Sequence, residues 1–270
     1  MVHGMRLSAT SKRPDPRKNA PAEAPAALQQ SPEDCRGLFV IGTDTGAGKT
    51  YVAALIAASI RAEGYRVGVY KPAASGCNKS GRTLVSEDAQ RLWNAAGKPG
   101  SLSAVCPQRF AAPLSPHLAA LEEHKELDQK KLRTGLTYWT RRSEFVVVEG
   151  AGGLLSPMGP TQYVADLVRE FGFPIVVVAP NRVGVINQTL QTLLAASSLC
   201  DKIPIAGVVL TDVFPPEHFD PSMPGNRAEL ELRCVPPVLA HVEHGAKRFA
   251  RDLRWSNFAA RSIHGAAPTH

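Results

Sequence analysis

The sequence is poor in several features that mark whole classes of protein. Its cysteines, Cys35, Cys77, Cys106, Cys200 and Cys234, are scattered, and no two of them lie two to four residues apart. This spacing argues against a zinc knuckle and favours buried free thiols in a reducing compartment. The apolar runs are too short to span a bilayer, and the N-terminus has no apolar core of a secretory signal. These absences predict a cytoplasmic protein with no membrane contact.

Acidic residues are also fewer than basic ones: the sequence has 24 Asp and Glu and 31 Lys and Arg, which gives a net charge of +7. A strongly basic protein can bind nucleic acid. Here one cluster of cationic residues lies in the N-terminal segment and another at positions 247–254, so the positive charge forms no single block. A polyanionic small substrate accounts for a basic protein equally well. We therefore expect small-molecule substrates and no nucleic-acid partner.

Composition divides the chain into three parts. Residues 1–34 are rich in Pro, Ala, Ser, Gln and charge, with almost no bulky apolar side chains, which predicts a disordered tail. Residues 35–245 form one predicted domain. As far as about residue 213 it alternates amphipathic helical segments with runs of Val and Ile that show no polar alternation, and Pro-rich stretches follow. That pattern predicts a parallel sheet covered by helices on both faces. Residues 246–270 form a basic C-terminal segment to which the sequence assigns no role.

The segment "GTDTGAGKT", residues 42–50, resembles a phosphate-binding loop but has five residues between Gly42 and Gly48. The common pattern has four. Its context nevertheless fits, because an apolar strand precedes it and a helical segment follows. In that position backbone N–H groups converge on phosphates at a helix N-terminus. Lys49 would reach the outer phosphates and the Thr50 hydroxyl would bind Mg²⁺. A plain strand-to-helix turn or a dinucleotide loop fits the spacing less well.

This loop, with its extra residue, resembles that of the dethiobiotin synthetase family, in which the longer gap is normal. Four other segments resemble the family in the same order. They are "YKPAASG" at 70–76, "LSPHLAA" at 114–120, "VVVEGAGGLLSP" at 146–157 and "VGVINQTLQTLLAA" at 183–196. The resemblance covers about residues 38–242. It implies an α/β, three-layer P-loop NTPase-like fold with a mostly parallel central sheet and helices on both faces.

The resemblance also implies a reaction. Enzymes of this family take one amine of 7,8-diaminononanoate, CO₂ and ATP to a carbamate and then to a carbamic-phosphoric anhydride. The second amine closes the ureido ring, and ADP and phosphate are released. Such chemistry requires cations for the phosphoryl oxygens, a Mg²⁺ ion and a site that holds a long diamine.

Two lysines and three oxygen donors are the candidates for this chemistry. Lys49 and Lys71 are the expected catalytic cations, and Lys71 matches the catalytic lysine of the family at the end of the second strand. Thr50, Asp88 and Glu149 match the Mg²⁺ ligands of the family, and hard oxygens are what that ion prefers. Glu149 ends a buried apolar run, where a carboxylate is costly without a cation.

The resemblance extends to residues that would contact the nucleotide and the diamine. The expected ATP-binding residues are Gly46, Ala47, Gly48, Lys49, Thr50, Tyr51, Asp88, Glu149, Gly150, Ala151, Gly152, Thr211 and Asp212. Expected substrate contacts are Thr45, Ser75, Gly153, Gly184, Val185, Ile186 and Asn187. The last four match a helix start that, in the family, binds the substrate carboxylate of the partner subunit. A homodimer with a shared site is therefore implied.

The sequence departs from the family where the adenine would bind. The family commonly has Asn-Asp after its fifth strand, and here Thr211-Asp212 takes that place. Residues 243–245 replace a later Pro-aromatic-Leu stretch. Thr211 offers a base a weaker set of hydrogen bonds than an amide does. The departure leaves the preference for ATP over other nucleoside triphosphates open.

Three other interpretations fit parts of the sequence. An amidoligase of cobalamin synthesis would carry a glutaminase domain, for which this chain has no room. A partition-type ATPase has a second lysine early in its loop, and Thr43, Asp44 and Thr45 offer none. A catalytically dead nucleotide-binding module is disfavoured by the presence of the two lysines and three metal-ligand candidates.

Overall fold

The computed structural model describes residues 34–261. The tail expected over residues 1–34 therefore lies outside the described residues except for Asp34. Residues 262–270 of the basic C-terminal segment also lie outside them.

A parallel sheet forms the centre of the molecule. Its strands are β1 (Arg36–Gly42), β2 (Val67–Tyr70), β7 (Phe145–Gly153), β8 (Ile175–Pro180), β9 (Ile205–Thr211) and β10 (Val238–Val242). They pair in the order β10-β9-β8-β1-β7-β2, and every pairing among them is parallel. A short seventh strand, β11 (Ala260–Arg261), adds antiparallel to β1. The predicted mostly parallel sheet is confirmed.

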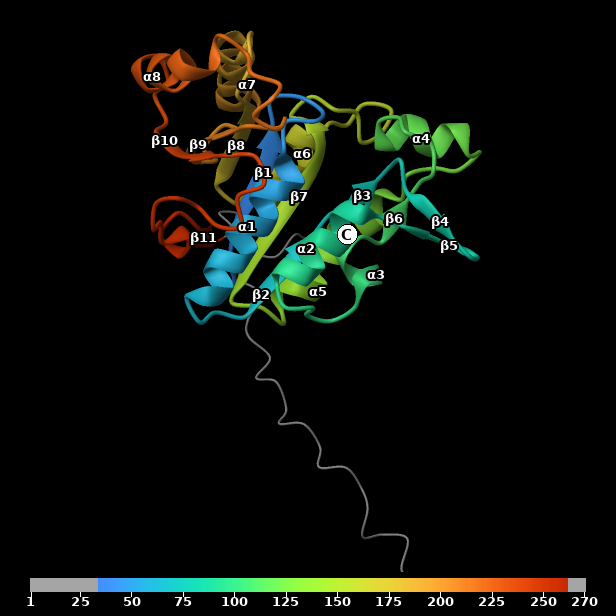
Figure 1. The fold of residues 1–270 in the computed structure, drawn as a ribbon. Coiled ribbons are helices and arrows are strands. Elements are labelled where there is room, and N and C mark those ends of the chain that lie inside the picture. The colour runs from blue at the N-terminus through green and yellow to red at the C-terminus, as the bar shows by residue number, and fades with distance from the viewer. Residues whose placement is uncertain (1–33, 262–270) are drawn as a thin grey trace, which may run out of the picture.

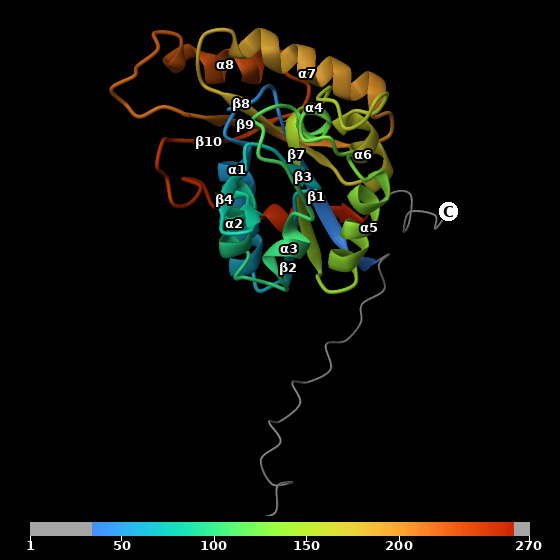
Figure 2. The same ribbon diagram turned by 90° about the vertical axis from the view of Figure 1, so that its right-hand side faces the viewer.

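Helices cover both faces of the sheet. The longer ones are α1 (Lys49–Ala62), α2 (Glu87–Ala95), α5 (Gln129–Thr140), α6 (Val164–Phe171), α7 (Val185–Leu199) and α8 (Met223–Arg233). Figure 2 shows α1 and α2 on one side of the sheet and α5 and α6 on the other. Shorter elements complete the chain: α3 (Leu102–Val105), α4 (Pro116–Glu122), β3 (Ala73–Ala74), β6 (Gln108–Arg109), β4 (Asn78–Ser80), β5 (Thr83–Val85) and η3 (Trp255–Asn257).

Burial of the strands follows from this layering. All six residues of β8 and the first six of β7 are buried, because helices exclude water from both faces. β1 lies between β7 and β8, so the chain crosses to one side of β1 and later to the other. Ligands of open α/β sheets bind outside the carboxyl ends of the strands at such a switch point.

Residues 150–153 continue β7 beyond Glu149. Gly153 pairs with Gly42 across an irregularity in the register with β1. Glycine-rich runs are typical of turns, and Gly152 does have a φ of 66°, but pairing with β1 resumes at Gly153 and keeps the segment in the sheet.

The C-terminal segment packs on the domain as far as it is described. Trp255 is fully buried, and its ring lies 4.8 Å from that of Phe249 and 5.7 Å from that of Phe258. The η3 turn contacts α1, and the Tyr51 hydroxyl donates to the Ala246 carbonyl. Within residues 34–261, no helix has both the length and the apolar character needed to cross a membrane.

Candidate active site

The segment 42–50 forms a loop between β1 and α1, as a phosphate-binding loop must. Gly46 and Gly48 have φ of 76° and 87°, a conformation that favours glycine. A methyl group on Gly48 would lie 3.1 Å from the Thr211 hydroxyl oxygen. Lys49 begins α1 and its Nζ donates to the Asp44 carbonyl at 3.1 Å. The extra residue is thus accommodated without disturbing the strand-loop-helix arrangement.

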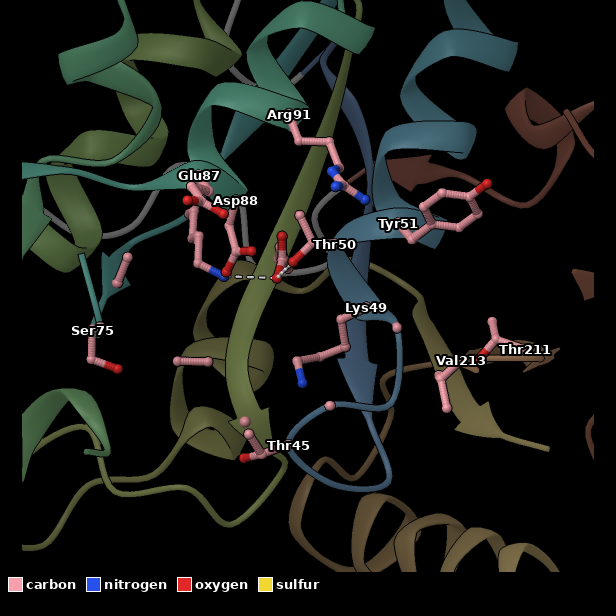
Figure 3. A pocket seen from close by; sticks show the side chains of 18 of the residues that line it. Thr45, Lys49, Thr50, Tyr51, Ser75, Glu87, Asp88, Arg91, Thr211 and Val213 are labelled. Carbon is pink, nitrogen blue, oxygen red and sulfur yellow. Dashed lines mark hydrogen bonds and ion pairs between the residues drawn. The ribbon is translucent and has the colours of Figure 1, made fainter. Parts of the chain in front are cut away.

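Strands β2 and β7 and the first turns of α1 and α2 bring four functional side chains together, of which Figure 3 labels Thr50 and Asp88. Lys71 follows β2, and its Nζ lies 2.7 Å from Glu149 Oε1 and 2.8 Å from Asp88 Oδ2. Glu149 extends from β7, and its Oε1 also accepts a hydrogen bond from Thr50 Oγ1 at 2.7 Å. Asp88 lies in the first turn of α2, which the Ser86 side chain caps. The arrangement unites residues separated by about a hundred positions.

Burial and charge set the protonation of this cluster. Burial alone would lower the pKa of Lys71, but Glu149 and Asp88 raise it above its ordinary value. Burial alone would raise the pKa of Asp88, but the charge and hydrogen bond of Lys71 lower it. For Lys49, burial prevails and lowers the pKa despite the opposing charge of Glu149. Lys71 and Asp88 are therefore held as an ion pair at neutral pH.

The carboxylate of Glu149 has one oxygen that a bound cation would satisfy. Its side chain is 1% exposed, and its Oε2 is buried with no hydrogen-bond partner among the described residues. An unpartnered buried carboxylate oxygen is costly unless a cation satisfies it. Within residues 34–261, no cluster made of three or more His, Cys, Asp or Glu side chains could hold a metal ion. A metal site here would therefore need an oxygen donor of another kind beside the carboxylates. Two carboxylates and the Thr50 hydroxyl together make a set of hard oxygens that suits Mg²⁺.

A cavity of about 880 Å³ contains this cluster. Fourteen of the residues expected from the sequence line it: Thr45, Gly46, Gly48, Lys49, Thr50, Tyr51, Lys71, Ser75, Asp88, Glu149, Ala151, Gly152, Thr211 and Asp212. The remaining expected residues, Ala47, Gly150, Gly153, Gly184, Val185, Ile186 and Asn187, are not in its lining. The last four begin α7, where Gly184 has φ of 89° and the Val185 side chain is fully buried.

The Thr211 hydroxyl is already engaged. It donates to the Ala47 carbonyl at 2.9 Å, lies 3.3 Å from the Ala179 carbonyl, and Thr211 is only 3% exposed. Its single proton is thus used to tie the end of β9 to the phosphate loop. Asp212 Oδ1 accepts from Asn181 Nδ2 and contacts His241 Nε2, both at 2.8 Å.

We predict that Thr211→Val destabilises the phosphate loop and does not change which nucleotide base the protein prefers. The variant keeps the shape of the side chain but leaves the buried Ala47 carbonyl without its donor. The free energy of unfolding should therefore fall by about 1–3 kcal/mol. Affinities for ATP, GTP and CTP should weaken by the same factor, measured by titration calorimetry. A loss confined to ATP would instead assign the hydroxyl to adenine.

Sequence reasoning missed several lining residues. Arg91 lies one turn beyond Asp88 on α2, and an i, i+3 spacing from an expected metal ligand was the available signal. Ser115 lines the cavity with a buried Oγ that has no partner among the described residues. It lies in the "LSPHLAA" segment, which the resemblance had marked. His117 of that segment is absent from the lining.

The fold and this site define a class, because a phosphate loop between β1 and α1 beside a lysine–carboxylate centre marks a P-loop nucleotide-binding protein. Residues 36–247 match a family described as "AAA domain". An ATP-dependent dethiobiotin synthetase of Rhodopirellula baltica is 42% identical over 215 residues, covering 76% of this chain and 82% of that protein. One from Anaeromyxobacter dehalogenans strain 2CP-C is 43% identical over 220 residues, covering 81% and 95%. The chain belongs to the ATP-dependent dethiobiotin synthetase family.

Proposed function

We propose that this protein carboxylates 7,8-diaminononanoate with CO₂ and closes the ring to dethiobiotin, converting ATP to ADP and phosphate. The observation that carries the proposal is the pairing of Lys71 with Asp88 and Glu149 in the cavity that Lys49 and the phosphate loop also line. The identity of 42% to a dethiobiotin synthetase supports it.

The lysines would act on the charges that develop during the reaction. An amine nitrogen attacks the carbon of CO₂ and loses a proton, which gives a carbamate. A carbamate oxygen then attacks the γ-phosphorus, and ADP leaves. Lys71, held in place by two carboxylates, is positioned to stabilise the carbamate and the transferring phosphoryl group. Lys49 would hold the γ-phosphate. The second amine then attacks the carbonyl carbon and expels phosphate.

Thr50, Asp88 and Glu149 would hold the Mg²⁺ ion. When bound, that ion supplies positive charge to the phosphate oxygens. The unpartnered Oε2 of Glu149 supports this assignment on grounds independent of the resemblance.

The diamine would occupy the end of the cavity away from Thr211. Figure 3 shows Ser75 on the opposite side of the cavity from Thr211 and Val213. Ser75 and the unpartnered Ser115 hydroxyl line the cavity and offer hydrogen bonds to the substrate. A preformed site with a few placed polar groups suits a small-molecule ligand.

A second copy of the chain would complete the site. The start of α7 does not line the cavity of its own chain, and this is what we expect if it contributes to the site of the partner subunit. Its residues are Gly184, Val185, Ile186 and Asn187. Large apolar side chains are also exposed near the start of α7 and along it, with Val183 at 74% and Leu194 at 70%. Such exposure favours a protein interface. We therefore propose a homodimer, and a cytoplasmic location in keeping with five free cysteines.

Light scattering tests the dimer. A homodimer should give twice the chain mass of 28.9 kDa. Val183→Glu places a charge in the proposed interface and should reduce both the mass and the activity, whereas Val235→Glu, at a 99% exposed position on a different loop, should reduce neither. A monomeric wild type with full activity would contradict the shared site.

The decisive experiment measures phosphate release from Mg-ATP with bicarbonate, with and without 7,8-diaminononanoate. Release that requires the diamine, together with the mass of dethiobiotin in the product, is expected. Chelation of Mg²⁺ by EDTA should abolish the release, and added Mg²⁺ should restore it. Release that does not require the diamine would instead favour an ATPase switch or an amidoligase with a different substrate.

A further inference from the structure

Arg91 is a cation of the cavity to which neither the sequence motifs nor the charged centre assigns a role. It lies on α2, three residues after Asp88, and lines the same cavity as Lys49 and Lys71. Residues at this spacing share one face of a helix. The orientation of α2 is fixed, because Leu92 is fully buried and Ser86 caps the helix through Ala89 N–H at 3.2 Å.

The guanidinium group lies against the first turn of α1. Arg91 Cζ is 5.8 Å from the centre of the Tyr51 ring, and Tyr51 directly follows Thr50. Figure 3 shows the side chain extending from α2 toward Thr50 and Tyr51. The Tyr51 hydroxyl bonds the Ala246 carbonyl, so the ring is held at its far end. A guanidinium within about 6 Å of an aromatic ring is attracted to its face, which orients Arg91 beside the phosphate loop.

Arg91 takes no part in the ion pairs of the charged centre. Lys71 contacts two carboxylates, Asp88 and Glu149. Arg91 forms no ion pair with any residue of the described part of the chain, 34–261. The two lysines and the two carboxylates of the centre cancel in formal charge. Glu87, Asp212 and Glu243 add further carboxylates to the lining, but none of them forms an ion pair with Arg91 within residues 34–261, so the guanidinium keeps its N–H donors for an anionic ligand.

We propose that Arg91 binds the α- and β-phosphates of the nucleotide. This inference rests on the proposed function only in requiring a nucleotide in the phosphate loop. N–H groups of the first turn of a helix are the donors that a bound phosphate chain meets, and Arg91 faces that turn. The planar guanidinium can donate two parallel hydrogen bonds to phosphate oxygens. Lys49 and Lys71 serve the γ-phosphate, so Arg91 contributes to nucleotide affinity and not to phosphoryl transfer.

Titration calorimetry with MgADP and MgATP tests the assignment on the full-length protein. Arg91→Gln should raise Kd for both nucleotides by the same factor, about 10-fold, as expected for loss of a charged hydrogen bond. Arg91→Lys keeps the positive charge but loses the two parallel N–H donors of the guanidinium, and it should give a smaller rise in Kd. The value of kcat at saturating ATP and diamine should stay within about twofold of wild type, because the γ-phosphate contacts remain.

Lys98→Gln is the matched control. Lys98 Nζ lies 5.7 Å from the centre of the Trp93 ring, a similar cation–ring contact just beyond α2, but Lys98 does not line the cavity. Its Kd values should equal those of wild type. Unchanged Kd values in folded Arg91→Gln would overturn the inference, as would a rise for MgATP alone. Failure of the proposed function would show separately, as phosphate release that does not require the diamine, and it would leave these comparisons of Kd unaffected.

Discussion

Lys71→Ala is expected to lower kcat by about 10² to 10³, because it removes a preorganised charge from the reacting groups. The affinity for MgATP should change little, since the phosphate loop and Lys49 remain. The rate of dethiobiotin formation at saturating substrates measures kcat, and titration calorimetry measures the affinity for MgATP. Normal turnover in a folded Lys71→Ala protein would remove this lysine from the mechanism.

The same substitution should also destabilise the protein. Glu149 is 1% exposed and loses the ammonium group that lies 2.7 Å from its Oε1. Removal of one partner of a buried ion pair costs about 3–5 kcal/mol, because an uncompensated charge stays behind. Urea denaturation should show this loss without Mg²⁺ and a smaller loss with it. Lys79→Ala, on the exposed strand β4, provides a control that should change neither quantity.

Trp255→Ala is expected to produce the largest loss of stability from a residue outside the cavity. Trp255 is fully buried, between Phe249 and Phe258, in a turn that contacts α1. Truncation of a buried aromatic side chain costs about 3–5 kcal/mol. We expect the lower end of this range, because the indole N–H is itself buried without a partner among the described residues. Urea denaturation followed by circular dichroism measures the change.

Trp255→Ala should also weaken the binding of the nucleotide. The segment that Trp255 anchors begins at Ala246, whose carbonyl accepts from the Tyr51 hydroxyl at the edge of the cavity. Loosening it should weaken nucleotide affinity while kcat at saturation is preserved. Phe219→Ala, at a 63% exposed position, should alter stability by less than about 0.5 kcal/mol. Wild-type stability in Trp255→Ala would show that the segment does not pack in solution as it does in the structure.

The fold was predictable wherever local pattern and burial agree. The Val- and Ile-rich runs became β1, β2, β7, β8 and β9, because a strand covered on both faces needs apolar side chains on both. β10 and α8 were not predicted, since the Pro-rich residues beyond 213 hide a short strand and helix. Likewise, residues 150–153 continue β7 because Gly153 pairs with Gly42, which depends on a neighbouring strand and not on the preferences of glycine.

By itself the sequence determined the phosphate loop, the class of fold and the family, because these depend on residue spacing along one segment and on runs of apolar side chains. Only the tertiary structure decided which charges face one another. It placed Lys71 between Asp88 and Glu149, left Glu149 Oε2 without a partner among residues 34–261, and engaged the Thr211 hydroxyl with the loop. It also directed Arg91 to the first turn of α1. Contacts between segments far apart in sequence are set by the packing of α1, α2 and the sheet, and no local pattern encodes them.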